Sequence, residues 1–299
     1  MMKYLNLTEG FVPYSCPQED VIKYETFTFS GGEPHIKILD DYSNEMHEVT
    51  VSIRINSFND MGLLMIAMEA LKQTGWVKDQ FLLLPYFPGA RQDRRMVPGE
   101  PLTVKVYADV INEMDFGEVI ILDPHSDVTP AVVDKVSVVN NHELVHECLK
   151  VIHTSPSKSA PYLISPDAGS NKKVKDLAMY LNKHSRIEVV KCDKTRDVTT
   201  GKISGFEVYA DDLKGRDCII VDDICDAGGT FLGLASELKA KGAGDLYLVV
   251  THGIFSKGFD KLTKYFKEIY CTDSFKSLED DTYNGFPTWG KLGVFQIKQ

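Results

Sequence analysis

The sequence lacks the features that would place it in a membrane or outside the cell. No segment approaches 18 consecutive apolar residues, which argues against a membrane-spanning helix. The first ten residues, MMKYLNLTEG, have neither the basic nor the apolar region of a secretory signal peptide. The six cysteines form no CxxC pair, so we expect reduced thiols in a cytoplasmic protein.

Positive charge is also scarce in this chain. Lys and Arg number 33 against 43 Asp and Glu, and the resulting net charge of -10 argues against a general surface for nucleic acids or anionic membranes. Any phosphate must therefore be bound by local groups. Short-period repeats and low-complexity segments are absent, and a chain of 299 residues is long enough for two domains.

Strand-like and helix-like segments alternate along the chain. Apolar, β-branched runs predict strands at 49–55, 81–86, 118–123, 162–165, 187–191, 217–223, 245–252 and 293–297. Helical periodicity predicts one helix that Asn59 caps and others at 101–114, 171–183 and 230–242. This alternation is typical of an α/β fold with parallel sheets flanked by helices. The pattern restarts after an irregular stretch at 139–160, which predicts two halves.

The stretch IIVDDICDAGGTFLG, residues 219–233, carries the strongest chemical signal. Asp222 and Asp223 are expected at the carboxyl end of a strand, where ligands bind in open α/β sheets. The following glycines open a helix, whose first amides attract phosphate. The carboxylates can accept hydrogen bonds from sugar hydroxyls or hold a metal ion. The pattern therefore predicts a phosphorylated sugar as ligand, and the alternative is an acidic, solvated turn.

VDDICDAGGT resembles the ribose-phosphate signature of the type I phosphoribosyltransferase superfamily. Further segments resemble, in the same order, motifs of the ribose-phosphate pyrophosphokinase (PRPP synthetase) family: FSGGE (29–33), PYFPGARQDRR (85–95), DPHSD (123–127), SPDAGS (165–170) and DKTR (193–196). The resemblance implies two similar phosphoribosyltransferase-like domains, each a mainly parallel sheet flanked by helices. We expect them at 1–145 and 146–284, and the tail 285–299 could return to the first.

The resemblance also implies an activity. Such an enzyme transfers the β,γ-diphosphoryl group of ATP to the 1-hydroxyl of ribose 5-phosphate, with Mg²⁺, and yields 5-phosphoribosyl 1-diphosphate and AMP. The partners expected are thus ATP, ribose 5-phosphate and further copies of the chain in a dimer-based homo-oligomer such as a hexamer. Neither nucleic acid nor membrane is expected as a partner.

The family motifs carry over to particular positions. Ribose 5-phosphate is expected to bind at Asp222, Asp223, Asp226, Ala227, Gly228, Gly229 and Thr230. ATP is expected to bind at Phe29, Gly31, Glu33, Arg91, Gln92 and Asp93. The metal is expected at His125 and Asp167, and Lys194 and Arg196 match the family's mobile catalytic loop.

Two of these assignments have alternatives. Gly31 stands where the family pattern FSDGE has an acid, which leaves the nucleotide preference open. Magnesium prefers oxygen ligands, so His125 could instead pack beside the nucleotide.

Two other functions are compatible with the sugar-phosphate motif. A phosphoribosyltransferase would bind the diphosphate product and a base, but a single-domain transferase needs neither ARQDRR nor FSGGE. A catalytically weak homologue would bind the same ligands and regulate a partner. The presence of Lys194 and Arg196 favours an enzyme over this alternative.

Two further patterns resemble functional motifs only in part. HELVH (142–146) fits the HExxH signature of zinc proteases, but no third ligand follows in a matching helix. GFPTWGKL (285–292) approaches a phosphate-binding Walker loop, but Leu292 replaces the Ser or Thr that such a loop needs for magnesium. We expect neither to be a functional site.

Overall fold

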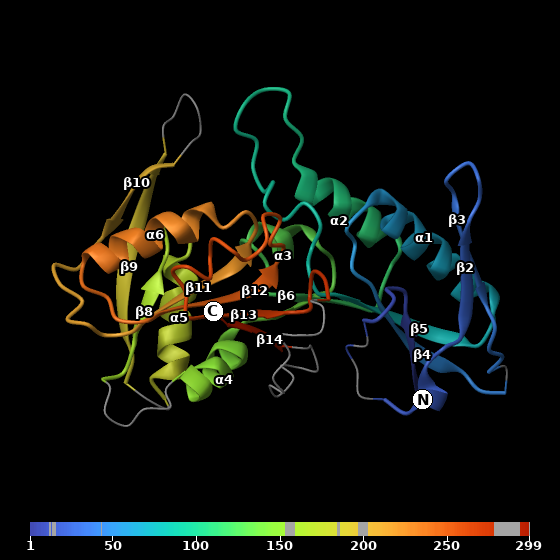
Figure 1. Cartoon of the computed structure of the whole chain (residues 1–299). Helices are drawn as coiled ribbons and strands as arrows, with labels where there is room; N and C mark the ends of the chain where they lie inside the picture. The colour runs from blue at the N-terminus through green and yellow to red at the C-terminus, as the bar shows by residue number, and fades with distance from the viewer. Residues whose placement is uncertain are drawn as a thin grey trace. The chain divides into compact units, whose positions relative to one another are not determined.

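The computed structural model describes residues 1–11, 13, 16–42, 44–152, 159–183, 186–196, 203–277 and 294–298. The chain forms two compact units, one within residues 1–140 and one that comprises 141–277 and 294–298 of the described residues (Figure 1). Each contains a sheet with helices, which confirms the α/β fold class. Among the described helices, none is long and apolar enough to cross a membrane.

The first unit is built on a five-stranded sheet in which every neighbouring pair is parallel. In spatial order its strands are β1 (Met2–Asn6), β4 (His47–Ser52), β5 (Val77–Leu84), β6 (Glu118–Leu122) and β7 (Val136–Val139). Its helices are α1 (Phe58–Gln73), α2 (Thr103–Glu113), α3 (Val128–Val132) and the short 3-10 turn η1 (Gln18–Asp20). Strands β2 (Tyr24–Thr28) and β3 (Pro34–Ile38) form a separate antiparallel hairpin.

The N-cap of helix α1 lies two residues before the expected one. Ser57, not Asn59, is the N-cap, and its hydroxyl accepts a hydrogen bond from the amide of Asp60. The carboxylate of Asp60 accepts one in return from the amide of Ser57 at 2.7 Å. This reciprocal pair satisfies the backbone amides of both Ser57 and Asp60, which explains why Ser57 and not Asn59 is the N-cap.

The second unit contains a seven-stranded sheet. In spatial order its strands are β10 (Ile203–Val208), β9 (Glu188–Arg196), β8 (Tyr162–Ser165), β11 (Cys218–Cys225), β12 (Leu246–Gly253), β13 (Glu268–Thr272) and β14 (Val294–Lys298). The five inner strands are parallel, and the two edge strands β10 and β14 are antiparallel to their neighbours. Its helices are α4 (His142–Ile152), α5 (Asn171–Leu181) and α6 (Gly229–Ala240).

The order in which the chain adds strands to this sheet changes side between β8 and β11. From β8 it passes through α5 to β9 on one side, and β11 then pairs with the other side of β8. The pairing of β8 with β11 ends at Ile164 and Ile220, whereas β11 continues to Cys225. The carboxyl ends of the two strands therefore open a crevice, the position at which ligands bind in open α/β sheets.

Two boundaries differ from those expected. The change of unit falls between Asn140 and Asn141, so that all of α4 belongs to the second unit, whereas the expected boundary followed residue 145. Strand β14 pairs with β13 over all five of its residues, so 294–298 belong to the second unit and not to the first. Residues 285–293 of the expected tail lie outside the described residues.

All six cysteines are free thiols. Five are buried, and burial raises the pKa of Cys192, Cys218 and Cys225 to about 12 and raises those of Cys148 and Cys271 above the ordinary value of a thiol. Only Cys16 is partly exposed.

Candidate functional site

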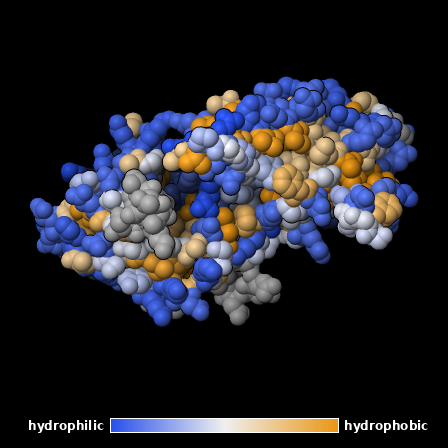
Figure 2. Space-filling model, turned by 90° about the horizontal axis from the view of Figure 1, so that it is seen from above, coloured by the Kyte–Doolittle hydropathy of each residue, from blue (hydrophilic) through white to orange (hydrophobic). Residues whose placement is uncertain are grey.

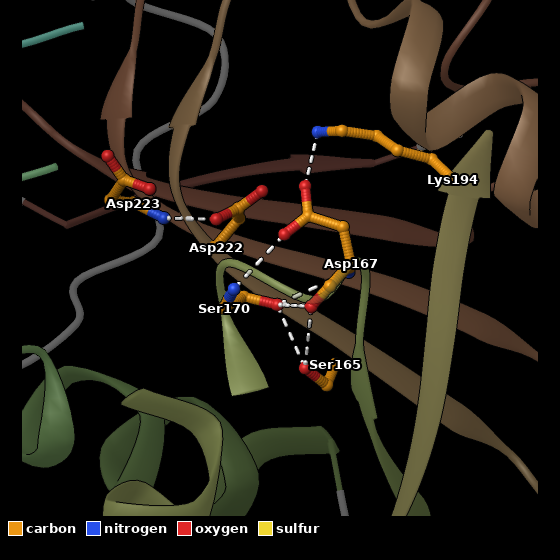
Figure 3. Close-up of polar contacts among 6 residues, drawn as sticks. All are labelled: Ser165, Asp167, Ser170, Lys194, Asp222 and Asp223. Atoms are coloured by element: carbon orange, nitrogen blue, oxygen red, sulfur yellow. Dashed lines mark hydrogen bonds and ion pairs between the residues drawn. The ribbon is translucent and has the colours of Figure 1, made fainter. Parts of the chain in front are cut away.

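The loop that follows β8, SPDAGS, is held by its own polar groups. The hydroxyl of Ser170 donates to the carbonyl of Asp167 at 2.8 Å, and the hydroxyls of Ser165 and Ser170 share a hydrogen bond of the same length. The amide of Ser170 donates to Oδ1 of Asp167 at 3.0 Å (Figure 3). These contacts fix the carboxylate of Asp167 at the carboxyl end of β8. The motif was predicted to be functional, but the roles of the two serines were not.

Asp222 and Asp223 lie inside β11. The expected strand ended at Asp223, but its pairing with β12 continues through Ile224 and Cys225. Neighbouring residues of a strand face opposite sides of the sheet, so the two carboxylates have different surroundings. Asp223 is only 6% exposed, whereas Asp222 is partly exposed and accepts a hydrogen bond from the amide of Asp223 at 3.0 Å. Of the two, Asp222 is therefore the one available to a ligand.

The side chains of Asp222 and Asp167 approach one another across the crevice (Figure 3). Burial, with the negative charges of Asp223 and Asp167, raises the pKa of Asp222 well above its ordinary value. A cation placed between the two carboxylates would relieve this repulsion. Their oxygens are the ligands that magnesium prefers, so the pair fits a magnesium ion. Within the described residues, no group of three His, Cys, Asp or Glu side chains is placed to hold a metal ion.

The glycine-rich loop lies directly beyond these acids. Gly228 has a left-handed backbone (φ 77°) and leads into α6, whose N-terminus has no side-chain cap. The left-handed backbone favours glycine at this position, and a Cβ there would lie 3.0 Å from the side chain of Leu262, which would have to shift. The first amides of α6 are thereby left for an anion. The other expected phosphate-binding residues, Ala227, Gly229 and Thr230, lie on the same loop and first turn.

Asp226, the third acid of the motif, contacts Ser256, which was not predicted to belong to the site. Its Oδ1 accepts a hydrogen bond from the hydroxyl of Ser256 at 2.6 Å. Thirty residues separate the two, and no local pattern predicts such a contact.

Lys194 provides positive charge at the same edge of the sheet. It lies opposite Phe206 in the β9–β10 hairpin, and its ammonium forms an ion pair with Oδ2 of Asp167. By resemblance Lys194 was expected in a mobile loop, whereas it lies in strand β9. Arg196 is the last residue of that strand, and its side chain lies outside the described part, as do residues 197–202.

The expected ATP-binding residues of the loop after β5 lie in the first unit. Arg91 and Gln92 are exposed, whereas Asp93 is 8% exposed and accepts a hydrogen bond from Nε of Arg94 at 3.0 Å. Hydrogen bonds from Arg94 and then Ser126 lower the pKa of Asp93, and His125 contributes its charge. Asp93 thus joins this loop to the one after β6. His125 belongs to that second loop and is exposed.

The FSGGE segment forms the turn of the β2–β3 hairpin. The ring of Phe29 is 52% exposed and packs edge-on against Phe27, with centroids 4.7 Å apart. The amide of Phe29 donates to the carbonyl of Glu33, which closes the turn. A Cβ at Gly31 would lie 2.5 Å from the carboxylate of Glu33, so an acid at this position would force Glu33 to move.

Of the two partial motifs, only HELVH lies within the described residues. His142 and His146 lie on α4, and their rings pack against Tyr180 with centroid distances of 5.2 and 6.2 Å. This gives both histidines a packing role at the contact of α4 with α5. GFPTWGKL lies outside the described residues.

Fold and site together define a class. A parallel sheet carries an acid pair and a glycine-rich loop at its switch point, which is the arrangement expected of the phosphoribosyltransferase fold. Residues 16–114 match the family described as the N-terminal domain of ribose phosphate pyrophosphokinase, and residues 185–274 match the phosphoribosyl synthetase-associated domain.

Curated relatives narrow this class to a family. The ribose-phosphate pyrophosphokinase of Aquifex aeolicus is 30% identical over 77% of this chain and 71% of its own. The putative ribose-phosphate pyrophosphokinase 2 of Streptococcus pyogenes is 30% identical over 85% of this chain and 76% of its own. The crystal structure of phosphoribosylpyrophosphate synthetase from Mycobacterium smegmatis shares the fold, with a TM-score of 0.75 at 22% identity over 95% and 92% of the two chains. The chain belongs to the ribose-phosphate pyrophosphokinase family.

Proposed function

We propose that this protein is a magnesium-dependent ribose-phosphate diphosphokinase. It transfers the β,γ-diphosphoryl group of ATP to the 1-hydroxyl of ribose 5-phosphate, and AMP leaves. The observation that carries the proposal is the convergence of Asp222, Asp167 and Lys194 with the 226–230 loop at one switch point. A site of this composition suits a ligand with a phosphate at one end and hydroxyls at the other.

In this proposal the acceptor lies along β11 and the start of α6. Amides of 226–230 and the Thr230 hydroxyl donate to the 5-phosphate. Asp222 accepts hydrogen bonds from ribose hydroxyls, either directly or through the metal. Asp223 faces the other side of the strand and supports Asp222 through its backbone amide.

The transfer needs in-line positioning and neutralisation of negative charge more than a covalent intermediate. Magnesium held by Asp167 and Asp222 supplies part of that neutralisation when bound. Lys194, and with it Arg196, balances charge on the transferred group. Arg91 and Gln92 are exposed donors for the nucleotide, whereas Asp93 holds their loop in place. Phe29, Gly31, Glu33 and His125 complete the proposed nucleotide and metal contacts.

We also propose that the chain acts as a homo-oligomer in the cytoplasm. Six free thiols suit a reducing compartment. Large apolar side chains are exposed mainly on the first unit, where hydrophobic surface is visible between hydrophilic areas (Figure 2). They include Phe27, Phe29, Leu39, Met46, Phe58, Met65, Met96, Val97 and Val106. Such surface suits contacts between copies of the chain.

The function is tested by AMP formation from Mg-ATP and ribose 5-phosphate. We expect AMP in proportion to ribose 5-phosphate consumed, and none after removal of magnesium by a chelator. Lys194→Ala should lower turnover by roughly 100-fold or more, because the positive charge that stabilises the transferred group is lost. Ribose 5-phosphate binding should persist, and Lys183→Ala, an exposed lysine after α5, should behave as the unmodified protein.

Two results would contradict the assignment. A protein that forms no AMP with any nucleotide and divalent metal is not a diphosphokinase. One that instead consumes 5-phosphoribosyl 1-diphosphate with a base is a phosphoribosyltransferase.

A further inference from the structure

A segment after β12 contacts the phosphate loop at several points. The amides of Ile254 and Phe255 both donate to the carbonyl of Cys225, at 2.9 and 3.1 Å. Ser256 donates to Asp226, and Leu262 packs against Gly228. Residues 254–262 thus contact the loop at its start, middle and end.

Lys257 stands at the exposed tip of this segment. The amide of Gly258 donates to the carbonyl of Phe255 at 3.0 Å, which closes a tight turn with Ser256 and Lys257 at its centre. Both central residues are exposed. Adjacent Cα atoms are only about 3.8 Å apart, and lysine carries its charge on a flexible four-carbon stem. Ser256 contacts Asp226, so Lys257 directly follows a residue that touches the 226–230 loop.

The loop carries an excess of negative charge, which a nearby cation would offset. Asp222, Asp223 and Asp226 place three carboxylates within five residues, whereas the amides of the loop carry only partial positive charge. Ser256 holds one oxygen of Asp226 in a hydrogen bond at 2.6 Å but leaves its negative charge in place. Among the described residues, Lys257 forms no ion pair. Lys194 is already engaged in an ion pair with Asp167.

We propose that Lys257 is a phosphate-binding residue that contacts the 5-phosphate of the acceptor and offsets Asp226. This inference rests on the proposed function, since it takes ribose 5-phosphate as the ligand of the loop. It predicts that acceptor affinity depends on a residue outside the 226–230 motif, on a segment that only the fold brings beside it.

The experiment is a calorimetric titration of the full chain with ribose 5-phosphate. Lys257→Gln removes the charge and leaves a shorter, polar side chain, and we expect roughly 10- to 100-fold weaker binding, the range for a lost charged hydrogen bond. Lys257→Arg should restore most of the affinity. Lys183→Gln, which removes an exposed charge at the far end of α5, should bind as the unmodified protein.

Equal affinity of Lys257→Gln and the unmodified protein would overturn the proposal, as would an equal loss in Lys183→Gln. In steady-state assays the KM for ribose 5-phosphate should rise far more than kcat falls, with the KM for ATP unchanged. If the unmodified protein forms no AMP but its binding of ribose 5-phosphate depends on Lys257, the diphosphokinase function fails and the role of Lys257 stands. If AMP forms and Lys257→Gln leaves the KM for ribose 5-phosphate unchanged, the diphosphokinase function stands and the role of Lys257 fails.

Discussion

Asp222 is a carboxylate whose ionised form is disfavoured in the folded chain. In the unfolded chain it ionises near its ordinary pKa of 3.8, whereas burial and the charges of Asp223 and Asp167 raise its pKa in the fold. Above about pH 4 the unfolded state therefore releases a proton that the folded state still holds. The stability contributed by this group thus falls as the pH rises towards the raised pKa.

Asp222→Asn should consequently stabilise the protein while it abolishes acceptor binding. We expect the melting temperature of the ligand-free variant at pH 8 to exceed that of the unmodified protein by roughly 2–4 °C, the shift that about 1 kcal/mol gives in a domain of this size. The difference should shrink towards pH 4. Thermal unfolding at both pH values measures it, and Asp226→Asn, which loses the acceptor of Ser256, should show no such gain. A lower melting temperature for Asp222→Asn at pH 8 would refute this account.

Single residues could be predicted where they belong to a continuous motif. The positions of Asp222, Asp167 and Gly228 in the site follow from the strand and glycine pattern, because parallel strands end at one edge of the sheet. The partnership of Ser256 with Asp226 could not be predicted, since it joins the loops of two neighbouring strands. The contact of Asp93 with Ser126 could not be predicted either, since it joins the loops after β5 and β6.

At the scale of elements, the β9–β10 hairpin is positioned by its contact with α6. A Cβ on Gly233 of α6 would lie 2.3 Å from Cε2 of Phe206 on β10. Phe206 lies directly opposite Lys194, so any displacement of its ring is transmitted to the strand that carries this cation.

Gly233→Ala should therefore lower turnover although the residue touches no substrate. The helix gains about 1 kcal/mol in propensity, but overpacking against Phe206 costs roughly 1–3 kcal/mol. We expect kcat to fall roughly tenfold, on the order of 1.4 kcal/mol, with little change in ribose 5-phosphate affinity. Gly205→Ala is the matched control, because a Cβ there meets nothing within 4 Å. If both variants turn over as the unmodified protein does, the contact does not position Lys194.

The order and type of the elements were largely predictable, but their ends were not. Apolar periodicity predicted most strands and helices of the two sheets, but it did not predict the strands β1, β7, β10 and β13 or the helices α3 and α4. Strand β11 continues two residues beyond the expected end, because β12 offers backbone partners up to Gly253. The polar residues of β9 read as a loop, yet pairing with β10 makes them a strand through Arg196. In each case the missing information is a partner distant in sequence.

For the whole molecule, the exposed apolar side chains of the first unit predict self-association. Phe58 is 74% exposed and stacks on Tyr107 with centroids 5.4 Å apart, so its ring is ordered before any partner arrives. We expect sedimentation to give a mass of at least two chains. Phe58→Asp should shift the assembly towards smaller species, whereas Lys72→Asp on the same helix should not. A monomer at micromolar concentration would contradict this expectation.

The division into two units was predictable from the restart of the strand–helix pattern, but its position was not. Helix α4 joins the second unit because its buried residues Leu144, Val145 and Cys148 pack there. Residues 294–298 complete the sheet of the second unit because β13 has an open edge. Sequence periodicity gives no information on which open edge a terminal strand will occupy.

The uneven burial of the thiols has a practical consequence. The deprotonated form reacts with maleimides, and at neutral pH the five buried cysteines are both shielded and protonated. Cys16 alone is partly accessible, so a fluorophore should attach to the folded, unmutated protein at one defined place. The native sequence thus offers a single labelling site on the first unit, from which ligand binding and assembly can be followed by fluorescence without engineering the chain.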